Sequence, residues 1–265
     1  MPGMSFLRPS LEKRSAGPPG KLVLIGPVIL LCAWYLVSLS AVVPAILLPS
    51  PASVLSQAGR DLLTTEIRHD ALITLLRAFG GYLLGMVIGI PLGVLAGLFP
   101  AFYKSFEFPL DFGRSLPVLT LFPLFMVFFG IGDLSRIATA AYPTILIILL
   151  NTYYGVRDIP RTRLMVARTR HASFGQTLLW VVLPGALPQI AAGLRISLSW
   201  AYLIVIVTEM YAGSDGGLGY RVINAYTTFE LAELYASILI TGTLGYLLNR
   251  VLVGLEERFV HWAGR

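Results

Sequence analysis

Cysteine and charge are both scarce in this 265-residue chain, and each scarcity excludes a class of protein. Cys32 is the single cysteine, so these residues form no intrachain disulfide and no thiolate metal centre. Charged residues make up 13%, against roughly 25% in soluble domains. Hydrophobic residues make up 56%, and the mean hydropathy is +0.76. So little charge cannot cover a water-facing surface, which predicts that a lipid bilayer surrounds most of the chain.

Groups that carry out catalysis are equally sparse. The three histidines, His69, His171 and His261, lie far apart in the sequence, and no His and Glu residues have the spacing of a metal site. The chain has no glycine-rich phosphate loop of the Walker type, so any ATPase that drives it must be another chain. A membrane-embedded enzyme would need acid, base or metal-binding side chains gathered at one depth. We therefore predict a non-enzyme with no catalytic residue, metal or cofactor of its own.

The positive charge raises nucleic acid as an alternative partner. The formal net charge is +6 and the sequence pI is about 9.6. However, the basic residues lie between apolar segments, and no surface combining aromatic and basic residues is evident. Basic cytoplasmic loops of a membrane protein explain the charge better, so we predict no nucleic-acid partner.

Six apolar stretches approach or exceed the roughly 20 residues that a helix needs to cross the hydrocarbon core. The predicted fold is therefore all-α, a polytopic bundle of six transmembrane helices. Residues 1–20 form a cytoplasmic tail and residues 21–265 the transmembrane domain. The segments 44–70 and 214–230 are predicted to be outer loops. The expected spans are Leu22–Val43, Ala71–Phe99, Phe106–Gly130, Leu134–Tyr154, Gly185–Ala212 and Leu231–Leu255.

The loops between the spans differ in basic residues, and this difference fixes the expected orientation. If the N-terminus is inside, the inner segments hold thirteen Lys and Arg residues and the outer ones only four. Lys and Arg are enriched in cytoplasmic loops of membrane proteins. We expect a multi-pass membrane protein with both termini in the cytoplasm.

Small residues recur at every fourth position in two spans. Glycine occupies every fourth position from Gly81 to Gly97, and Gly193, Ser197 and Ala201 repeat the spacing in the fifth span. Such stripes let a neighbouring backbone approach closely, so we interpret them as packing surfaces without chemistry. The residues singled out for helix packing are Gly85, Gly89, Gly93, Gly193 and Ser197.

The functional candidates among charged residues within the predicted spans are Arg77, Arg114, Arg195 and Glu209, because charge there is expensive and usually functional. Asp111 and Arg114 are three residues apart on one helical face, so a local ion pair and a role in guiding an anion are alternatives. Snorkelling or pairing explains Arg77 and Arg195 at least as well as ligand binding. Glu209 ends the fifth span and can reach water there.

Proline interrupts the third predicted span at Pro109, Pro117 and Pro123. Each proline removes a backbone donor and invites a kink, and broken helices in membranes are buried in protein or line a cavity. The third span is therefore the expected cavity-lining element. The residues predicted to line a translocation pathway are Arg114, Pro117, Phe122 and Glu209.

The inner segment 157–184 resembles a known element. Residues 165–176 read MVARTRHASFGQ and residues 181–188 read VVLPGALP, which is similar to the EAA loop of binding-protein-dependent ABC permeases. Further resemblance to the nitrate, sulfonate, taurine and bicarbonate branch runs from about Leu47 to Arg258. It rests on the motifs LPSP at 48–51, GIPLG at 89–93, FFGIG at 128–132, TEM at 208–210 and GGLGY at 216–220.

The resemblance implies a type I importer permease of the bacterial cytoplasmic (inner) membrane. Its inner loop would form a helix-turn-helix, the coupling helix, that docks on separate ABC ATPase subunits. ATP and Mg would bind to those subunits. A periplasmic or lipid-anchored substrate-binding protein would deliver a small anion, and two permease chains, as a homodimer or heterodimer, would move it by alternating access. The residues that the resemblance assigns to ATPase coupling are Met165, Ala167, Arg168, His171, Ala172, Ser173 and Gln176.

The chain departs from the family pattern at three positions in this loop. Met165 and Val166 replace the Glu and first Ala of the motif, and His171 replaces its Gly. If that Gly permits a turn with positive φ, His is disfavoured there but not excluded. Two alternatives remain. For the whole protein, the alternative is an ATP-independent secondary transporter or channel. For the inner loop, it is a basic segment that only orients the protein in the membrane.

Overall fold

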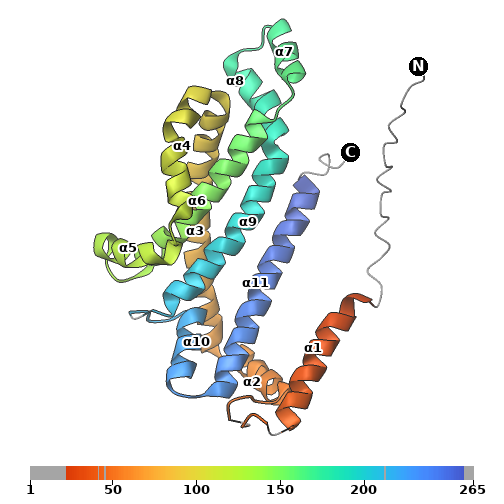
Figure 1. Ribbon diagram of the computed structural model, residues 1–265, viewed down its shortest axis with the longest axis vertical. Coiled ribbons are helices and arrows are strands. Elements are labelled where there is room, and N and C mark those ends of the chain that lie inside the picture. Colours follow the sequence, from red (N-terminus) through yellow and green to blue (C-terminus); the bar gives the residue numbers. More distant parts are fainter. Residues whose placement is uncertain (1–21, 41, 45, 212, 260–265) are drawn as a thin grey trace, which may run out of the picture. The chain divides into compact units, whose positions relative to one another are not determined.

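The protein is helical throughout the part that the computed structural model describes, residues 22–40, 42–44, 46–211 and 213–259 (Figure 1). The expected tail, residues 1–20, and His261 lie outside these residues. The helices are α1 (Leu22–Leu39), α2 (Pro51–Leu63), α3 (Thr65–Leu98), α4 (Pro100–Ser115), η1 (Val118–Leu121), α5 (Phe122–Phe129), α6 (Asp133–Arg157), α7 (Arg161–Thr169), α8 (Phe174–Thr177), η2 (Leu178–Val182), α9 (Leu183–Glu209), α10 (Leu218–Thr227) and α11 (Leu231–Phe259).

The chain divides into two units, residues 1–53 and 54–265. The first unit contains the apolar helix α1, and the indole N–H of Trp34 donates to the carbonyl of Pro49 at 3.1 Å. The described apolar part of α1, Ile25–Leu39, is shorter than the four long helices of the second unit. A sixth span within Leu22–Val43 therefore stays a prediction.

The second unit is a bundle in which α3 packs against both α6 and α9. Thr64 caps the start of α3 by accepting from the amide of Ile67, and Pro100 follows its end, because the residue before a proline disfavours helical geometry. Figure 1 shows α7 and α8 at one end of this bundle and α10 at the other. We call these the α7–α8 end and the α10 end.

The glycine stripe of α3 lies against α6. A β-carbon at Gly85 would lie 2.7 Å from the β-carbon of Thr144, and one at Gly93 would lie 2.5 Å from the carbonyl oxygen of Leu149. Only hydrogen atoms at these positions leave room for α6. In the same way, Gly193 of α9 faces Asn151, and the buried Ser197 donates to the carbonyl of Leu194 at 3.0 Å.

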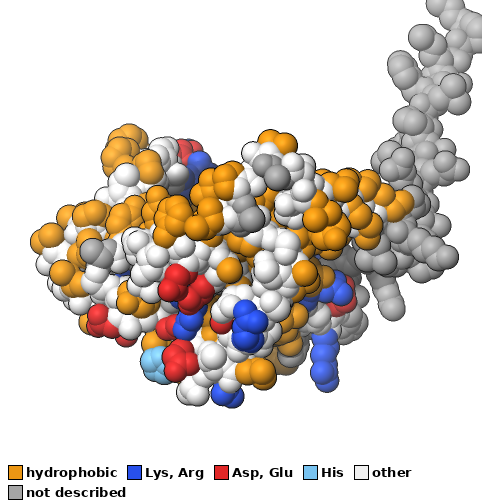
Figure 2. All heavy atoms as spheres, turned by 90° about the horizontal axis from the view of Figure 1, so that it is seen from below, with side chains coloured by type: hydrophobic (Ala, Val, Ile, Leu, Met, Phe, Trp, Pro, Cys, Tyr) orange, Lys and Arg blue, Asp and Glu red, His pale blue; other side chains and the backbone are white. Residues whose placement is uncertain are grey.

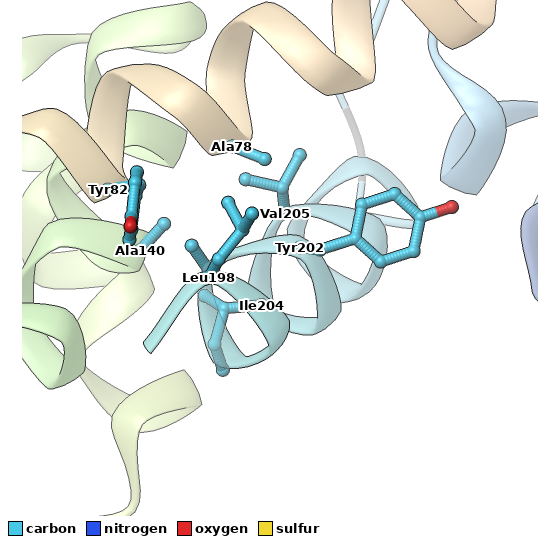
Figure 3. Packing of buried hydrophobic residues seen from close by; sticks show 8 residues of the cluster. Ala78, Tyr82, Ala140, Leu198, Tyr202, Ile204 and Val205 are labelled. Carbon is cyan, nitrogen blue, oxygen red and sulfur yellow. The ribbon is translucent and has the colours of Figure 1, made fainter. Parts of the chain in front are cut away.

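An apolar core joins the three helices at mid-length (Figure 3). Ala78 and Tyr82 of α3 and Ala140 of α6 pack with a row of α9 side chains. Tyr202 points away from Ala78 in Figure 3, and its hydroxyl donates to the carbonyl of Thr241, so it connects α9 with α11.

The third predicted span is not one straight helix. Residues 100–115 and 118–129 form two arms bent by 96° at Leu116 and Pro117. Pro117 forces its predecessor into an extended conformation, with ψ of 130° at Leu116, and this ends α4. Pro109 is accommodated inside α4, and Pro123 lies in the first turn of α5, where its missing N–H has no partner to lose.

Two of the expected outer loops contain helices. The segment 44–70 includes α2, and the segment 214–230 includes α10. Both helices are short and amphipathic, and their polar residues conceal them from a search for long apolar runs. The sequence analysis described these segments only as outer loops between spans, so the two helices within them were not predicted.

Candidate functional site

A glycine-rich segment, Gly213–Gly219, connects α9 to α10 at the α10 end. Gly213 and Gly217 have φ of 83° and 113°, values that side-chain-bearing residues rarely adopt. A β-carbon at Gly219 would collide with the carbonyl oxygen of Ile206, and one at Gly217 would collide with the carboxylate of Glu209. The glycines are therefore required by backbone conformation and by close approach to α9.

Five side chains bind the backbone of this segment. Arg77 and Arg136 donate to the carbonyls of Gly216 and Gly213 at 2.8 and 2.9 Å. The amides of Gly217, Leu218 and Gly219 donate to side-chain oxygens at 2.9 to 3.0 Å. Their acceptors are Asp70, Thr74 and Glu209, in that order. We call these five residues, Asp70, Thr74, Arg77, Arg136 and Glu209, the loop clamp.

An ion pair lies at the centre of the loop clamp. The Glu209 carboxylate is fully buried and accepts from Arg77 at 2.8 Å and from the hydroxyl of Thr74 at 2.9 Å. Arg77 also binds Asp133 at 2.6 Å, whose side chain is 64% exposed. A buried carboxylate needs such partners because its desolvation is expensive. The pair thus joins the α10 ends of α3, α6 and α9.

Two further ion pairs, both made by Arg221, connect the clamp to α10 and α11. Arg221 of α10 binds Asp70 at 3.1 Å and Glu233 of α11 at 2.9 Å. The α10 end is therefore one connected polar network, and Figure 2, which looks at this end, shows acidic and basic side chains gathered among apolar ones. Arg136 is the one member of the loop clamp whose buried guanidinium is not fully hydrogen-bonded among the described residues. The residue is 2% exposed, and its Nε has no partner there.

The prediction that Glu209 reaches water was wrong, because α10 and the preceding segment cover it. Sequence reasoning also missed Asp70, Thr74 and Arg136 as members of a site. A signal was available in α3. Asp70, Thr74 and Arg77 recur at i, i+4 and i+7, which places one polar stripe on an otherwise apolar helix.

At the α7–α8 end, the expected helix-turn-helix is present. The helix α7 ends in a Schellman turn, in which the amide of Ala172 donates to the carbonyl of Ala167 at 3.0 Å and that of His171 donates to Arg168 at 2.9 Å. His171 has φ of 52°, the left-handed conformation that this motif usually gives to glycine. The turn at His171 does have a positive φ, so histidine occupies the conformation in which it is disfavoured but not excluded.

The second helix of the loop begins with a capping box. The amide of Gln176 donates to the hydroxyl of Ser173, and the Gln176 side chain accepts from the Ser173 amide. Ala167 is buried, whereas Met165, Val166 and Phe174 are each more than half exposed. Arg168 is exposed, so the loop presents apolar side chains and basic charge together.

Replacing His171 with glycine is expected to stabilise the turn between α7 and α8 by about 1 kcal/mol, because the left-handed conformation costs an L-residue roughly that much. The measurement is hydrogen exchange of residues 161–177 in the intact chain, where His171→Gly should slow the Ala172 amide. The matched control is His69→Gly inside α3, which should weaken its own helix by about 1 kcal/mol. Faster exchange in His171→Gly would show that the strain is absent.

The predicted pathway residues lie apart from the clamp, except for Glu209. Arg114 binds Asp111 at 2.6 Å, which confirms the local ion pair. Pro117 lies at the bend, and Phe122, which is buried, packs edge-on against Tyr211 with ring centroids 5.6 Å apart. Arg195 pairs with Glu256 of α11 at 2.9 Å, so pairing with a neighbouring helix accounts for it.

Length and composition identify the membrane-crossing elements. Four stretches are long and apolar enough, namely α3, α6, the continuous helix Phe174–Glu209, and α11 as far as Arg258. The bent pair α4 with η1–α5 supplies a fifth if it counts as one span. No group of three potential metal-binding side chains occurs among the residues that the structure describes. The fold thus defines a multi-pass membrane protein.

Comparison with known families then identifies the class of transporter. The family described as "Binding-protein-dependent transport system inner membrane component" matches residues 89–262, which include the clamped segment and the helix-turn-helix. The chain belongs to this family and is an ABC transporter permease subunit.

Two relatives match nearly the whole chain. It is 31% identical to the putative aliphatic sulfonates transport permease protein SsuC of Bacillus subtilis, over 90% of this chain and 86% of that protein. It is 28% identical to the taurine transport system permease protein TauC of Escherichia coli, over 89% and 87%. Among solved structures, an inward-facing MetNI methionine ABC transporter aligns with a TM-score of 0.64 at 22% identity, covering 75% of this chain and 96% of that one.

Proposed function

We propose that this chain forms the membrane passage of an importer for a small organic sulfonate of the taurine or alkanesulfonate type. A separate ATPase drives it by alternating access. The observation that carries the proposal is the continuous helix Phe174–Glu209, which begins in the exposed helix-turn-helix and ends in the loop clamp. At 1.5 Å per residue its 36 residues span about 54 Å, so one rigid element reaches both ends of the bundle.

The ATPase side of the proposal rests on exposed apolar residues. Met165, Val166 and Phe174 face outward beside a row of arginines at the α7–α8 end. Exposed apolar side chains rimmed by polar residues mark interaction sites, and basic charge beside them suits an acidic protein surface. A separate ATPase subunit that binds ATP and Mg is the partner that fits this family. The passage itself is completed by a second permease chain, and a homodimer is the simplest assembly.

The opposite end of the bundle suits the delivery of substrate. The loop clamp holds Gly213–Gly219 rigid, which gives a substrate-binding protein a fixed surface to recognise. Any force that tilts Phe174–Glu209 must displace Glu209 from Arg77 or carry α3 with it. An ATPase shifts this equilibrium only if it binds one arrangement better than the other.

The cargo is proposed from the relatives, whose names specify aliphatic sulfonates and taurine. All three intramembrane arginines form ion pairs, but Arg77 is buried in its pair whereas the side chain of Arg114 is half exposed beside Asp111, so Arg114 is better placed than Arg77 to meet an anion.

The test is co-purification followed by uptake. The tagged chain is extracted gently from native membranes, and co-purifying proteins are identified by mass spectrometry. Stoichiometric ATPase should be present, and it should be lost when residues 167–176 are replaced by a flexible linker of equal length. The complex in proteoliposomes, supplied with its binding protein and internal ATP, should then accumulate taurine or ethanesulfonate.

A matched variant separates docking from folding. Met165→Ser removes an exposed apolar side chain from α7. Leu164→Ser instead alters the neighbouring, partly buried side chain, which packs against the apolar cluster near the start of α9. Met165→Ser should reduce ATPase recovery at unchanged chain yield, and Leu164→Ser should reduce yield. Uptake that proceeds without any ATPase subunit would instead favour a secondary transporter.

A further inference from the structure

A cavity of about 220 Å³ lies where the bent helix meets the bundle. It is lined by the end of α4 and by Val118 of η1, with α6 opposite and Trp200 of α9 at one side. Tyr142 lies nine residues after Asp133 at the start of α6, and Trp200 lies nine residues before Glu209. At 1.5 Å per residue both are about 14 Å along the helix axes from the loop clamp, so the cavity lies away from the α10 end, along the length of the bundle.

The cavity combines an apolar wall with a few convergent polar groups, which is the usual composition of a small-molecule site. Leu146, Ile147 and Val118 form the apolar wall, and Arg114 and Tyr142 bring polar atoms to it. The volume is below the roughly 300–1,000 Å³ that drug-sized ligands occupy, so it suits a molecule of only a few heavy atoms.

The free donors of the cavity favour an anion. Arg114 uses one Nη to bind Asp111 at 2.6 Å, which leaves its other N–H groups available. The indole N–H of Trp200 has no hydrogen-bond partner among the described residues. The Tyr142 hydroxyl is committed as a donor to the carbonyl of Gly113 at 2.9 Å, so it can only accept a further bond.

We propose that this cavity is a sulfonate subsite of the passage, with Arg114 and the Trp200 indole N–H donating to the sulfonate oxygens and the apolar wall contacting the carbon chain. This inference rests on the proposed function. A guanidinium presents several donors in a fixed plane, which matches an oxyanion better than a point charge does. Asp111 offsets part of the positive charge, so the anion is held weakly enough to leave, as a passage requires.

The position of the cavity supports this assignment. Intramembrane ionisable groups that face the interior of a bundle mark substrate pathways. Irregular backbone at membrane depth is tolerated where it is buried or lines a cavity, and the break at Leu116 and Pro117 borders this one. The side chain of Arg114 is 50% exposed in the single chain, so its guanidinium is accessible from outside that chain.

The experiment uses the whole complex in proteoliposomes with its binding protein, and taurine and a series of linear alkanesulfonates as probes. Arg114→Gln should lower taurine uptake at least tenfold, while binding-protein-stimulated ATP hydrolysis stays within twofold of the parent. The matched control is Arg195→Gln, which removes a similarly exposed arginine paired with Glu256 and should leave uptake within twofold. Trp200→Phe removes the indole N–H and should lower uptake of every sulfonate without changing the ranking by chain length.

Each other outcome overturns the subsite. Unchanged uptake in Arg114→Gln, or equal losses in Arg114→Gln and Arg195→Gln, removes the special role of Arg114. Loss of ATP hydrolysis together with uptake assigns Arg114 to folding or assembly. If the unsubstituted complex takes up no sulfonate at all, the proposed cargo is wrong as well. If the unsubstituted complex and Arg114→Gln take up sulfonate equally, only the subsite is wrong.

Discussion

Glu209→Ala is expected to destabilise the chain by about 3 kcal/mol and to release the segment Gly213–Gly219. Removing one partner of a buried ion pair costs roughly 3–5 kcal/mol because the other charge stays buried. The lower end applies here, since Arg77 keeps Asp133 and the Gly216 carbonyl. The variant also leaves the Gly219 amide and the Thr74 hydroxyl without an acceptor. The measurement is the apparent Tm of the detergent-solubilised chain by size-exclusion recovery after heating.

Two variants isolate the cause. Glu209→Gln retains an oxygen acceptor without the charge, so its loss should be intermediate. Asp133→Asn alters the exposed partner of the same arginine and should lower the apparent Tm only slightly, because exposed ion pairs contribute about 0–1 kcal/mol. Equal losses in Glu209→Ala and Asp133→Asn would contradict the assignment of Glu209 as the buried centre of the clamp.

Local features of the fold could be predicted from the sequence because they depend on near neighbours. The turn at His171 follows from backbone sterics within a single helix end, and the Asp111–Arg114 pair follows from three-residue spacing. The break of the third span was signalled by Pro117, although its 96° angle was not. That angle depends on how α5 packs, which single-chain spacing does not encode.

The loop clamp could not be predicted because its partners are far apart in the sequence. Thr74 and Glu209 are 135 residues apart, and Gly217 and Asp70 are 147 apart. A lone glutamate at a span end has a simple alternative in water, and only the covering by α10 removes that alternative. The polar stripe of α3 indicated that something polar must face it, but it did not indicate what.

The short helices α2 and α10 were also missed by the sequence analysis. Both are amphipathic, with polar faces that lower their average hydropathy. A hydropathy search looks for apolar length and therefore interprets them as loops. The position of α10 depends on a tertiary contact, the ion pair between its Arg221 and Asp70 of α3.

Gly93→Ala is expected to destabilise the chain by about 1–3 kcal/mol, although alanine is the better helix former. The added β-carbon would lie 2.5 Å from both the Leu149 carbonyl oxygen and the Thr152 β-carbon. Neither is the flexible end of a side chain, so α3 and α6 must separate, and such overpacking costs roughly that amount. Helix propensity opposes this loss by about 1 kcal/mol. The apparent Tm of the solubilised chain should fall.

Gly242→Ala supplies the matched control, since a β-carbon there meets nothing within 4 Å. Gly242 lies inside α11, so only the gain in helix propensity remains, and the apparent Tm should be unchanged or slightly raised. The two substitutions are chemically identical, and their effects should have opposite signs. A rise for Gly93→Ala would mean that α3 and α6 are not in close contact. The glycine stripe would then reflect lipid exposure, and the bundle would lack the small-residue interface that brings Arg77 within reach of Asp133.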